Sequence, residues 1–165
     1  MRTLIQRVTN AKVVVGGETI SQIQNGILAL VGCGKNDTLD DVSWTSKKLL
    51  SLRIFDENGK PWTGSITSLG YSLLLVSQFT LHASCKKTKP SFQRAMGGDE
   101  AKVLFDALVA QCREGGVVCE TGQFGEMMEV SLTNDGPVTF FLDSKNQQDL
   151  PFDATSDEVV DGEKN

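Results

Sequence analysis

The segment TLIQRVTNAKVVVGGETISQIQNGILALV, residues 3–31, predicts a series of strands joined by short turns. Apolar and polar residues alternate over residues 3–8, and residues 12–15 are rich in β-branched side chains. Gly16-Gly17 and Asn25-Gly26 are dipeptides that two-residue hairpin turns favour. Further strands follow over residues 20–23 and 27–31, so we expect a sheet that begins as antiparallel neighbours.

The rest of the chain adds helices and more strands. Two helices are expected over residues 37–53 and 99–114, with Asp37 and Asp99 as their N-terminal caps. Glycine, proline and polar residues over 56–69 predict a loop. Further strands are expected over residues 71–81, 117–120, 128–133 and 138–143. Many short strands with two helices indicate an α+β domain, in which two main helices cover a barrel-like, mainly antiparallel sheet.

Length and charge divide the chain into one domain and a tail. The 165 residues, 39% of them hydrophobic, suit a single core, which we assign to residues 1–143. Residues 144–165 contain six acidic residues and two lysines, and they are predicted to be a disordered acidic tail. The tail holds most of the net charge of −5, so this charge is a poor guide to partners. Apolar runs are too short to span a bilayer, and we expect a cytoplasmic protein with no membrane partner.

The cysteines and the histidine do not predict a metal site. Cys33, Cys85, Cys112 and Cys119 lack C-x-x-C spacing, and His82 is the only histidine. We therefore expect reduced thiols, with Cys85 the most exposed, and neither a metal nor a cofactor.

The first segment that could carry chemistry is Ser77-Gln78-Phe79-Thr80, at the end of an apolar strand. Strand alternation would place Thr80 and His82 on one face, so Thr80 could be a nucleophile with His82 as its base. It could equally be an ordinary strand threonine beside a solvated histidine. Backbone N–H groups at this strand end could also form an oxyanion hole.

Two more segments allow both an ordinary and a functional interpretation. Asn134-Asp135-Gly136-Pro137 reads as a tight turn between two strands, but Gly136 would also let a ligand approach the backbone closely. Lys86, Lys87 and Lys89 form a loop that is either simply solvated or able to hold phosphates.

Taken together, these motifs resemble a known family. SQFTL at 77–81 and NDGPVT at 134–139 are similar to the two signature motifs of D-aminoacyl-tRNA deacylases, in the same order and spacing. MRTLIQRV at 1–8, GKND at 34–37, KPSF at 89–92 and GQFG at 122–125 also match. The resemblance covers residues 1–143 and leaves the acidic tail outside.

The resemblance implies a homodimer with active sites at the interface. Gly136-Pro137 would be cis and would reach into the partner's pocket, where its carbonyls hold the substrate's α-amino group and exclude an L side chain. Arg7 matches the arginine that orients this loop. Asn134 and Thr139 belong to the same substrate-binding motif.

The resemblance also implies the chemistry. The backbone near Phe79 and Thr80, with Ser77 and Gln78, would position and polarise the ester, and the terminal 2′-hydroxyl of the tRNA would activate water. Glycyl-tRNA is expected as a second substrate, because glycine has no side chain to exclude. Lys86, Lys87 and Lys89 would bind tRNA, and no DNA partner is expected.

Two other functions stay open on the residues alone. A threonine-nucleophile esterase would require the hydroxyl of Thr80. A non-catalytic tRNA-binding module would bind tRNA whatever amino acid is attached and would hydrolyse nothing.

Overall fold

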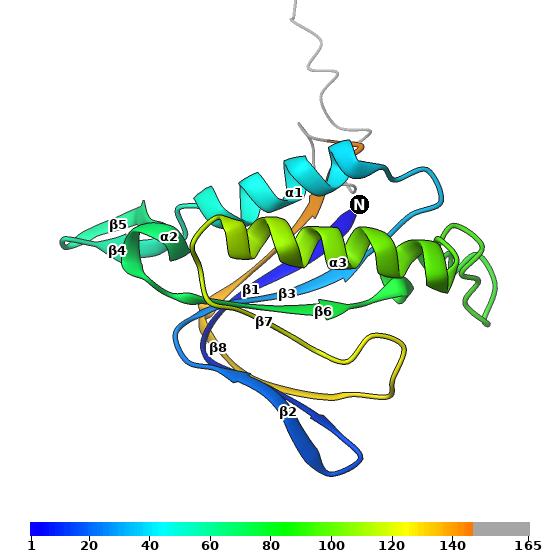
Figure 1. The fold of residues 1–165 in the computed structure, drawn as a ribbon, viewed down its shortest axis with the longest axis horizontal. Coiled ribbons are helices and arrows are strands. Elements are labelled where there is room, and N and C mark those ends of the chain that lie inside the picture. The colour runs from blue at the N-terminus through cyan, green and yellow to red at the C-terminus, as the bar shows by residue number, and fades with distance from the viewer. Residues whose placement is uncertain (147–165) are drawn as a thin grey trace, which may run out of the picture.

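The computed structural model describes residues 1–146, and one long strand organises its sheet (Figure 1). Strand β1 (Arg2–Val15) pairs antiparallel with β8 (Glu129–Asp143) along one edge. Its other edge pairs with β2 (Glu18–Ile23) and then β3 (Gly26–Gly32), also antiparallel. The predicted strands at residues 3–8 and 12–15 are therefore one strand.

The other strands make the sheet mixed. Strand β6 (Ser72–Ser77) runs parallel to β3, and β7 (Cys119–Thr121) runs parallel to β6. The α+β, barrel-like prediction is confirmed, but the main sheet is mixed, because only the pairs that β1 makes in it are antiparallel. Long crossovers through helices precede β6 and β7, and such connections return the chain in the same direction.

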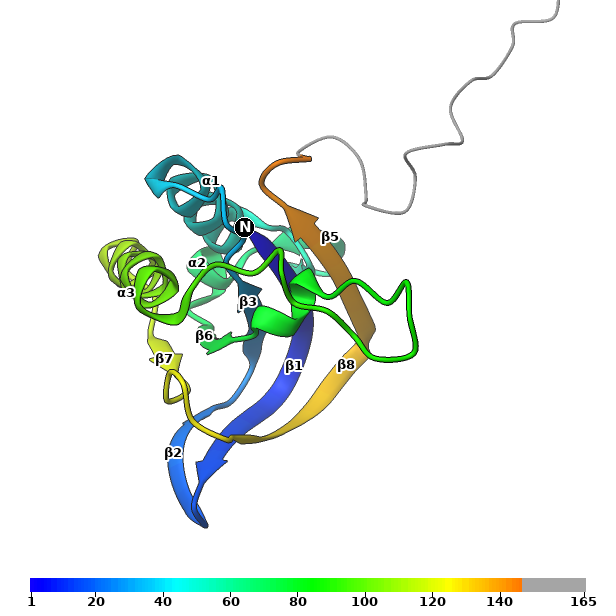
Figure 2. The same ribbon diagram turned by 90° about the vertical axis from the view of Figure 1, so that its right-hand side faces the viewer.

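The two main helices cover one face of the curved sheet (Figure 2). Helix α1 (Leu39–Ser51) and helix α3 (Gly98–Glu114) lie side by side and bury apolar residues against β3 and β6. The opposite face holds a second apolar cluster, which includes Val13, Leu28 and Leu74. Because β6 is covered on both faces, its apolar run is continuous rather than alternating.

Neither helix is capped by the predicted residue: α1 begins after Asp37, and α3 begins before Asp99. Thr38 is the N-cap of α1 and forms a capping box with Asp41, while Asp37 accepts hydrogen bonds from the Met1 ammonium (2.7 Å) and the Gly34 amide (2.6 Å). Gly97 is the N-cap of α3, so Asp99 lies in the first turn, where its charge favours the helix dipole.

The predicted loop at residues 56–69 contains secondary structure. Strands β4 (Phe55–Glu57) and β5 (Lys60–Gly64) form a hairpin, and the short helix α2 (Ile66–Leu69) follows. The glycine and proline signals were real, but they belong to a hairpin whose strands are too short to show a period.

Residues 134–137 bulge out of a strand instead of turning between two strands. Gln6 pairs with Thr139 and Val8 with Asn134, so a two-residue step on β1 faces a five-residue step on β8. Both halves of β8 pair with β1, which is long enough to hold them in one direction. The predicted reversal of the chain here is therefore wrong.

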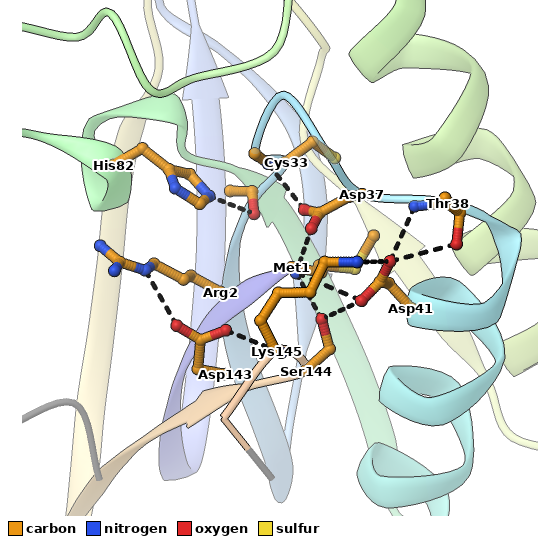
Figure 3. A network of polar contacts seen from close by, with 12 residues as sticks. Met1, Arg2, Cys33, Asp37, Thr38, Asp41, His82, Asp143, Ser144 and Lys145 are labelled. Carbon is orange, nitrogen blue, oxygen red and sulfur yellow. Dashed lines mark hydrogen bonds and ion pairs between the residues drawn. The ribbon is translucent and has the colours of Figure 1, made fainter. Parts of the chain in front are cut away.

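The last described residues fasten the end of β8 to α1 (Figure 3). Ser144 is buried and donates a hydrogen bond to Asp41 (2.6 Å), and Lys145 forms an ion pair with the same carboxylate (2.6 Å). Burial alone would raise the pKa of Asp41, but hydrogen bonds from Lys145, Ser144 and the Thr38 amide lower it well below its usual value. Disorder was predicted for residues 144–165, of which 147–165 lie outside the described residues, whereas Ser144 and Lys145 make the contacts given above.

No helix within residues 1–146 is both long enough and apolar enough to cross a membrane.

Candidate functional site

A cavity with a volume of about 620 Å³ lies between the sheet and α3. The four candidate residues Ser77, Gln78, Phe79 and Thr80 all line it. They stand together because β6 ends at Ser77 and the chain then enters a 3₁₀ turn, η1 (Phe79–His82).

The 3₁₀ turn changes which side chains face the cavity. Alternation predicted Thr80 and His82 on one face, but Thr80 is exposed at the cavity whereas His82 is buried. The prediction was wrong because the strand stops four residues earlier than its apolar pattern indicated. In the described chain the amides of Phe79 and Thr80, which open the turn, have no backbone acceptor. They are free to donate to a ligand.

Among residues 1–146 no carboxylate or imidazole is hydrogen-bonded to Thr80, although Glu126 lines the same cavity. The Thr80 hydroxyl accepts a hydrogen bond from the Gln78 amide (2.5 Å), which is a donor and cannot remove a proton. The Nε2 of His82 instead contacts the Gly32 carbonyl oxygen at 3.1 Å. Burial, the largest cause, lowers the pKa of His82 below its usual value. The prediction of a solvated histidine is therefore wrong.

The cavity also contains a thiol, Cys33. Burial and the nearby Asp37 carboxylate raise the pKa of Cys33 to about 11, so the group is a neutral thiol at physiological pH. A neutral buried thiol is a weak nucleophile, and Cys33 acts as part of the apolar wall. Cys85 is exposed, as predicted from its polar neighbours.

The bulge in β8 presents Gly136 and Pro137 to solvent. The peptide bond between them is cis, and both residues are exposed. Neither lines the cavity beside Phe79 and Thr80 in the described chain. One chain therefore displays the two motifs at separate places.

Arg7 holds the bulge in place through Asp135. Its Nε donates to the carbonyl oxygen of Asp135 (3.3 Å) and forms an ion pair with the carboxylate of the same residue (3.0 Å). Its Nη1 donates to the Ile54 carbonyl oxygen at 2.6 Å. The guanidinium also lies 6.0 Å from the ring centre of Phe55 and 5.9 Å from that of Trp62.

Asn134 and Thr139 close the base of the bulge. The Asn134 amide donates to the carbonyl oxygens of Arg7 (2.8 Å) and Val138 (3.0 Å), and Thr139 donates to the Asn134 side-chain oxygen (3.1 Å). The polar groups of the Asn134 side chain are therefore hydrogen-bonded to other groups of the protein. Both residues therefore brace the bulge.

The lysine loop stands beside the cavity mouth. Ser84 and Ser91 exchange backbone hydrogen bonds of 2.8 and 3.0 Å and so close the loop that carries Lys86, Lys87 and Lys89. Next to it, Phe92 packs against Phe79 with ring centres 5.0 Å apart. The three lysines line a hollow of about 480 Å³.

Other residues of the cavity were not predicted from the sequence. Met96, Phe105, Phe124 and Met128 line it together with the predicted residues. They come from α3 and from the segments before it and before β8. Apolar side chains carry no local sign of a site, so only the tertiary structure could identify them.

Two comparisons of sequence agree with the motifs. Residues 4–143 match the family model described as D-Tyr-tRNA(Tyr) deacylase. A D-aminoacyl-tRNA deacylase from Clostridium perfringens is 47% identical over 146 residues, which is 88% of this chain and 98% of that protein. One from Thermosipho africanus is 46% identical, with the same coverage.

Two solved structures share the fold. A structure titled c-Myc DNA Unwinding Element Binding Protein superposes with a TM-score of 0.82 at 41% identity, over 87% of this chain and 98% of that one. A structure described as a probable eukaryotic D-amino acid tRNA deacylase gives a TM-score of 0.77 at 15% identity, over 86% and 97%. The matched range, the identities and their coverage show that the chain belongs to the D-aminoacyl-tRNA deacylase family.

Proposed function

We propose that the protein hydrolyses the ester bond of D-aminoacyl-tRNA, and of glycyl-tRNA, and so removes D-amino acids from tRNA in the cytoplasm. Water adds to the ester carbonyl, and the bond to the terminal ribose breaks to release the free amino acid and tRNA. The observation that carries the proposal is the cavity at Phe79 and Thr80, where two unpaired amides meet an apolar wall.

The two amides suit the carbonyl oxygen of an ester. Negative charge grows on that oxygen as water adds, and fixed N–H donors stabilise it more in the transition state than in the substrate. No carboxylate or imidazole of the described residues is hydrogen-bonded to Thr80, so we assign activation of water to the terminal 2′-hydroxyl of the tRNA. Ser77 and Gln78 then act as positioning residues.

Selection of the D form requires a second chain. Gly136 and Pro137 project into solvent away from their own cavity, which suits a part that completes the site of a partner. In a symmetric dimer each bulge would enter the other subunit's cavity. The carbonyls of Gly136 and Pro137, in a bulge that Arg7 holds through Asp135, would then bind the α-amino group and exclude an L side chain.

The lysine loop suits the phosphates of the tRNA. Lys86, Lys87 and Lys89 are exposed and stand next to the cavity through the contact between Phe92 and Phe79. Phosphate contacts position a nucleic acid and carry no information on chirality. We therefore assign these lysines to affinity alone.

The competing functions predict different behaviour. A threonine esterase would need a base hydrogen-bonded to Thr80, which the described residues do not show, and a simple tRNA-binding module has no use for a braced, exposed glycine. One relative carries a DNA-binding name. Preference for DNA over tRNA of equal length would contradict the substrate proposed here.

The direct test compares matched substrates. We expect the purified protein to hydrolyse D-aminoacyl-tRNA and to leave the matched L-aminoacyl-tRNA intact over the same time, as measured by loss of the labelled ester. Glycyl-tRNA should also be hydrolysed, because it presents no side chain to exclude. Equal rates on the D and L substrates would overturn the proposal.

Removing the hydroxyl of Thr80 distinguishes the proposed mechanism from a threonine nucleophile. Thr80→Val keeps the shape of the side chain, and we expect kcat/KM to stay within about tenfold of wild type because only a neutral hydrogen bond to Gln78 disappears. Single-turnover hydrolysis of D-aminoacyl-tRNA measures the effect. A loss of about 10⁴-fold, typical when a nucleophile is removed, would instead support the esterase.

A further inference from the structure

A second hollow, of about 370 Å³, is lined by the N-terminal residue, the loop before α1 and the segment before α3. It shares Gln93 and Arg94 with the hollow of the lysine loop, so the two hollows are neighbours. Five positive groups line it against two carboxylates, Asp37 and Asp143. The positive groups are the Met1 ammonium, Arg2, Lys35, Arg94 and Lys145.

Ion pairs neutralise three of the five positive groups. The Met1 ammonium pairs with Asp37 at 2.7 Å, and the Arg2 Nε pairs with Asp143 at 3.1 Å. Lys145 pairs with a carboxylate of α1. Lys35 and Arg94 form no ion pair within residues 1–146, and both are exposed. The positive charge left over in this hollow therefore belongs to these two residues.

Lys35 and Arg94 lie on the same small ribbon that forms a wall of the cavity. Gly34 and Ala95 pair as an isolated antiparallel bridge. On one side of the bridge the Met96 amide donates to the Cys33 carbonyl oxygen (2.9 Å), and both of these residues line the cavity. On the other side the Lys35 amide donates to the Arg94 carbonyl oxygen (3.1 Å).

The ribbon therefore sets the distance between the cavity and the two cations. Lys35 follows Cys33 by two residues, and Arg94 precedes Met96 by two, so each backbone separation is about 7 Å at most. That is the scale of one nucleotide. A nucleic-acid chain whose last ribose enters the cavity would bring its nearest phosphates to this ribbon.

We propose that Lys35 and Arg94 bind a phosphate of the single-stranded 3′ end of tRNA, next to the aminoacylated nucleotide. The inference rests on the proposed function, since it places the ester in the cavity. Lys35 supplies a point charge, and Arg94 can bind two phosphate oxygens at once. Further phosphates of the tRNA would then lie beyond Arg94, near Lys86, Lys87 and Lys89.

The test pairs a double variant with two substrates. For Lys35→Gln/Arg94→Gln we expect KM for D-aminoacyl-tRNA to rise about tenfold or more, with kcat unchanged, because the phosphate no longer meets two positive charges. Hydrolysis of D-aminoacyl-adenosine, which carries no phosphate, should keep wild-type kinetics. A purely structural role for the two residues would impair both substrates.

A binding measurement decides the same point without hydrolysis. We expect the log–log salt dependence of the affinity for uncharged tRNA to become shallower by about 0.7 for each single-strand phosphate that the variant no longer neutralises. Lys12→Gln is the control, because this exposed lysine of β1 lies ten residues from Arg2, about 33 Å along the strand. An unchanged salt slope, or an equal change in the Lys12 variant, would overturn the inference. Failure of wild type to hydrolyse D-aminoacyl-tRNA would contradict the proposed function and leave this measurement valid.

Discussion

Gly136→Ala is expected to lower kcat/KM for D-aminoacyl-tRNA by about 10²-fold or more, the cost of displacing a site by about an ångström. An added Cβ would lie 2.8 Å from the Val138 Cγ2 and 3.2 Å from the Arg7 Nη2, and the φ of +119° is one that side chains rarely adopt. The bulge must therefore move. Because Gly136 is exposed and outside the core, the thermal stability of the domain should change little.

Gly17→Ala is a matched control for this variant. Gly17 also has a positive φ, +85°, but an added Cβ there meets no atom within 4 Å. It lies in the turn between β1 and β2, away from the bulge. Both variants carry backbone strain, and only Gly136→Ala should lose hydrolysis. Equal activity in the two variants would remove the bulge from the mechanism.

Co-expression can show whether the bulge acts across subunits. Gly98→Trp should obstruct the cavity, since Gly98 lines it and has open space around its Cα. A mixed dimer of Gly136→Ala and Gly98→Trp chains would contain one intact site, formed by the cavity of the first and the bulge of the second. Random pairing should restore about a quarter of wild-type activity. No recovery in a verified mixed dimer would place the bulge and cavity of one site in the same chain.

The predicted helices and strands agree with the structure where the spacing of apolar residues alone determines the element. Both helices predicted at 37–53 and 99–114 are present, and their first residues differ from the predicted ones by one or two positions. The helical spacing of apolar residues identifies a helix even when its cap is assigned to the wrong residue. The apolar run before Ser77 did form a strand, but its end could not be read from the sequence. Phe79 and Leu81 fit a strand equally well, and it is the 3₁₀ turn that points them differently.

The resemblance to a family predicted both motifs and assigned Arg7 to the Gly-Pro loop, but local patterns alone predicted none of the contacts between distant residues. Residues 77–80 of SQFTL line the cavity, and NDGPVT contains the bulge. The ties that give the bulge its shape join residues far apart in sequence, as with Arg7 and Ile54 or Asn134 and Arg7. No spacing along the chain records such contacts, because they depend on which strands become neighbours.

Asn25-Gly26 illustrates how a strong local signal can be misread. It predicted a hairpin turn, but β2 and β3 do not pair with each other; both pair with β1. The backbone of Gly26 is not in the left-handed region. The glycine is needed for a different reason, which is the close approach of Ser72 at the start of β6.

Gly26→Ala is therefore expected to destabilise the protein strongly. An added Cβ would overlap the backbone carbonyl of Ser72 and lie 2.8 Å from its carbonyl carbon. The Ser72 amide also donates to the Asn25 carbonyl oxygen (3.1 Å), so the two backbones are held together at this point. Backbone cannot rotate away as a side chain can, and the parallel pair of β3 and β6 must separate.

Overpacking of this kind costs about 3 kcal/mol or more at its upper range. For a domain of this size we expect Tm to fall by roughly 6–12 °C. Gly98→Ala is the control: an added Cβ there meets nothing within 4 Å, and alanine favours a helix, so Tm should hold or rise slightly. If Gly26→Ala and Gly98→Ala have the same Tm, β3 and β6 must lie further apart than in this structure. The paired ends of β3 and β6, where Val31 and Ser77 line the cavity, would then have a different geometry.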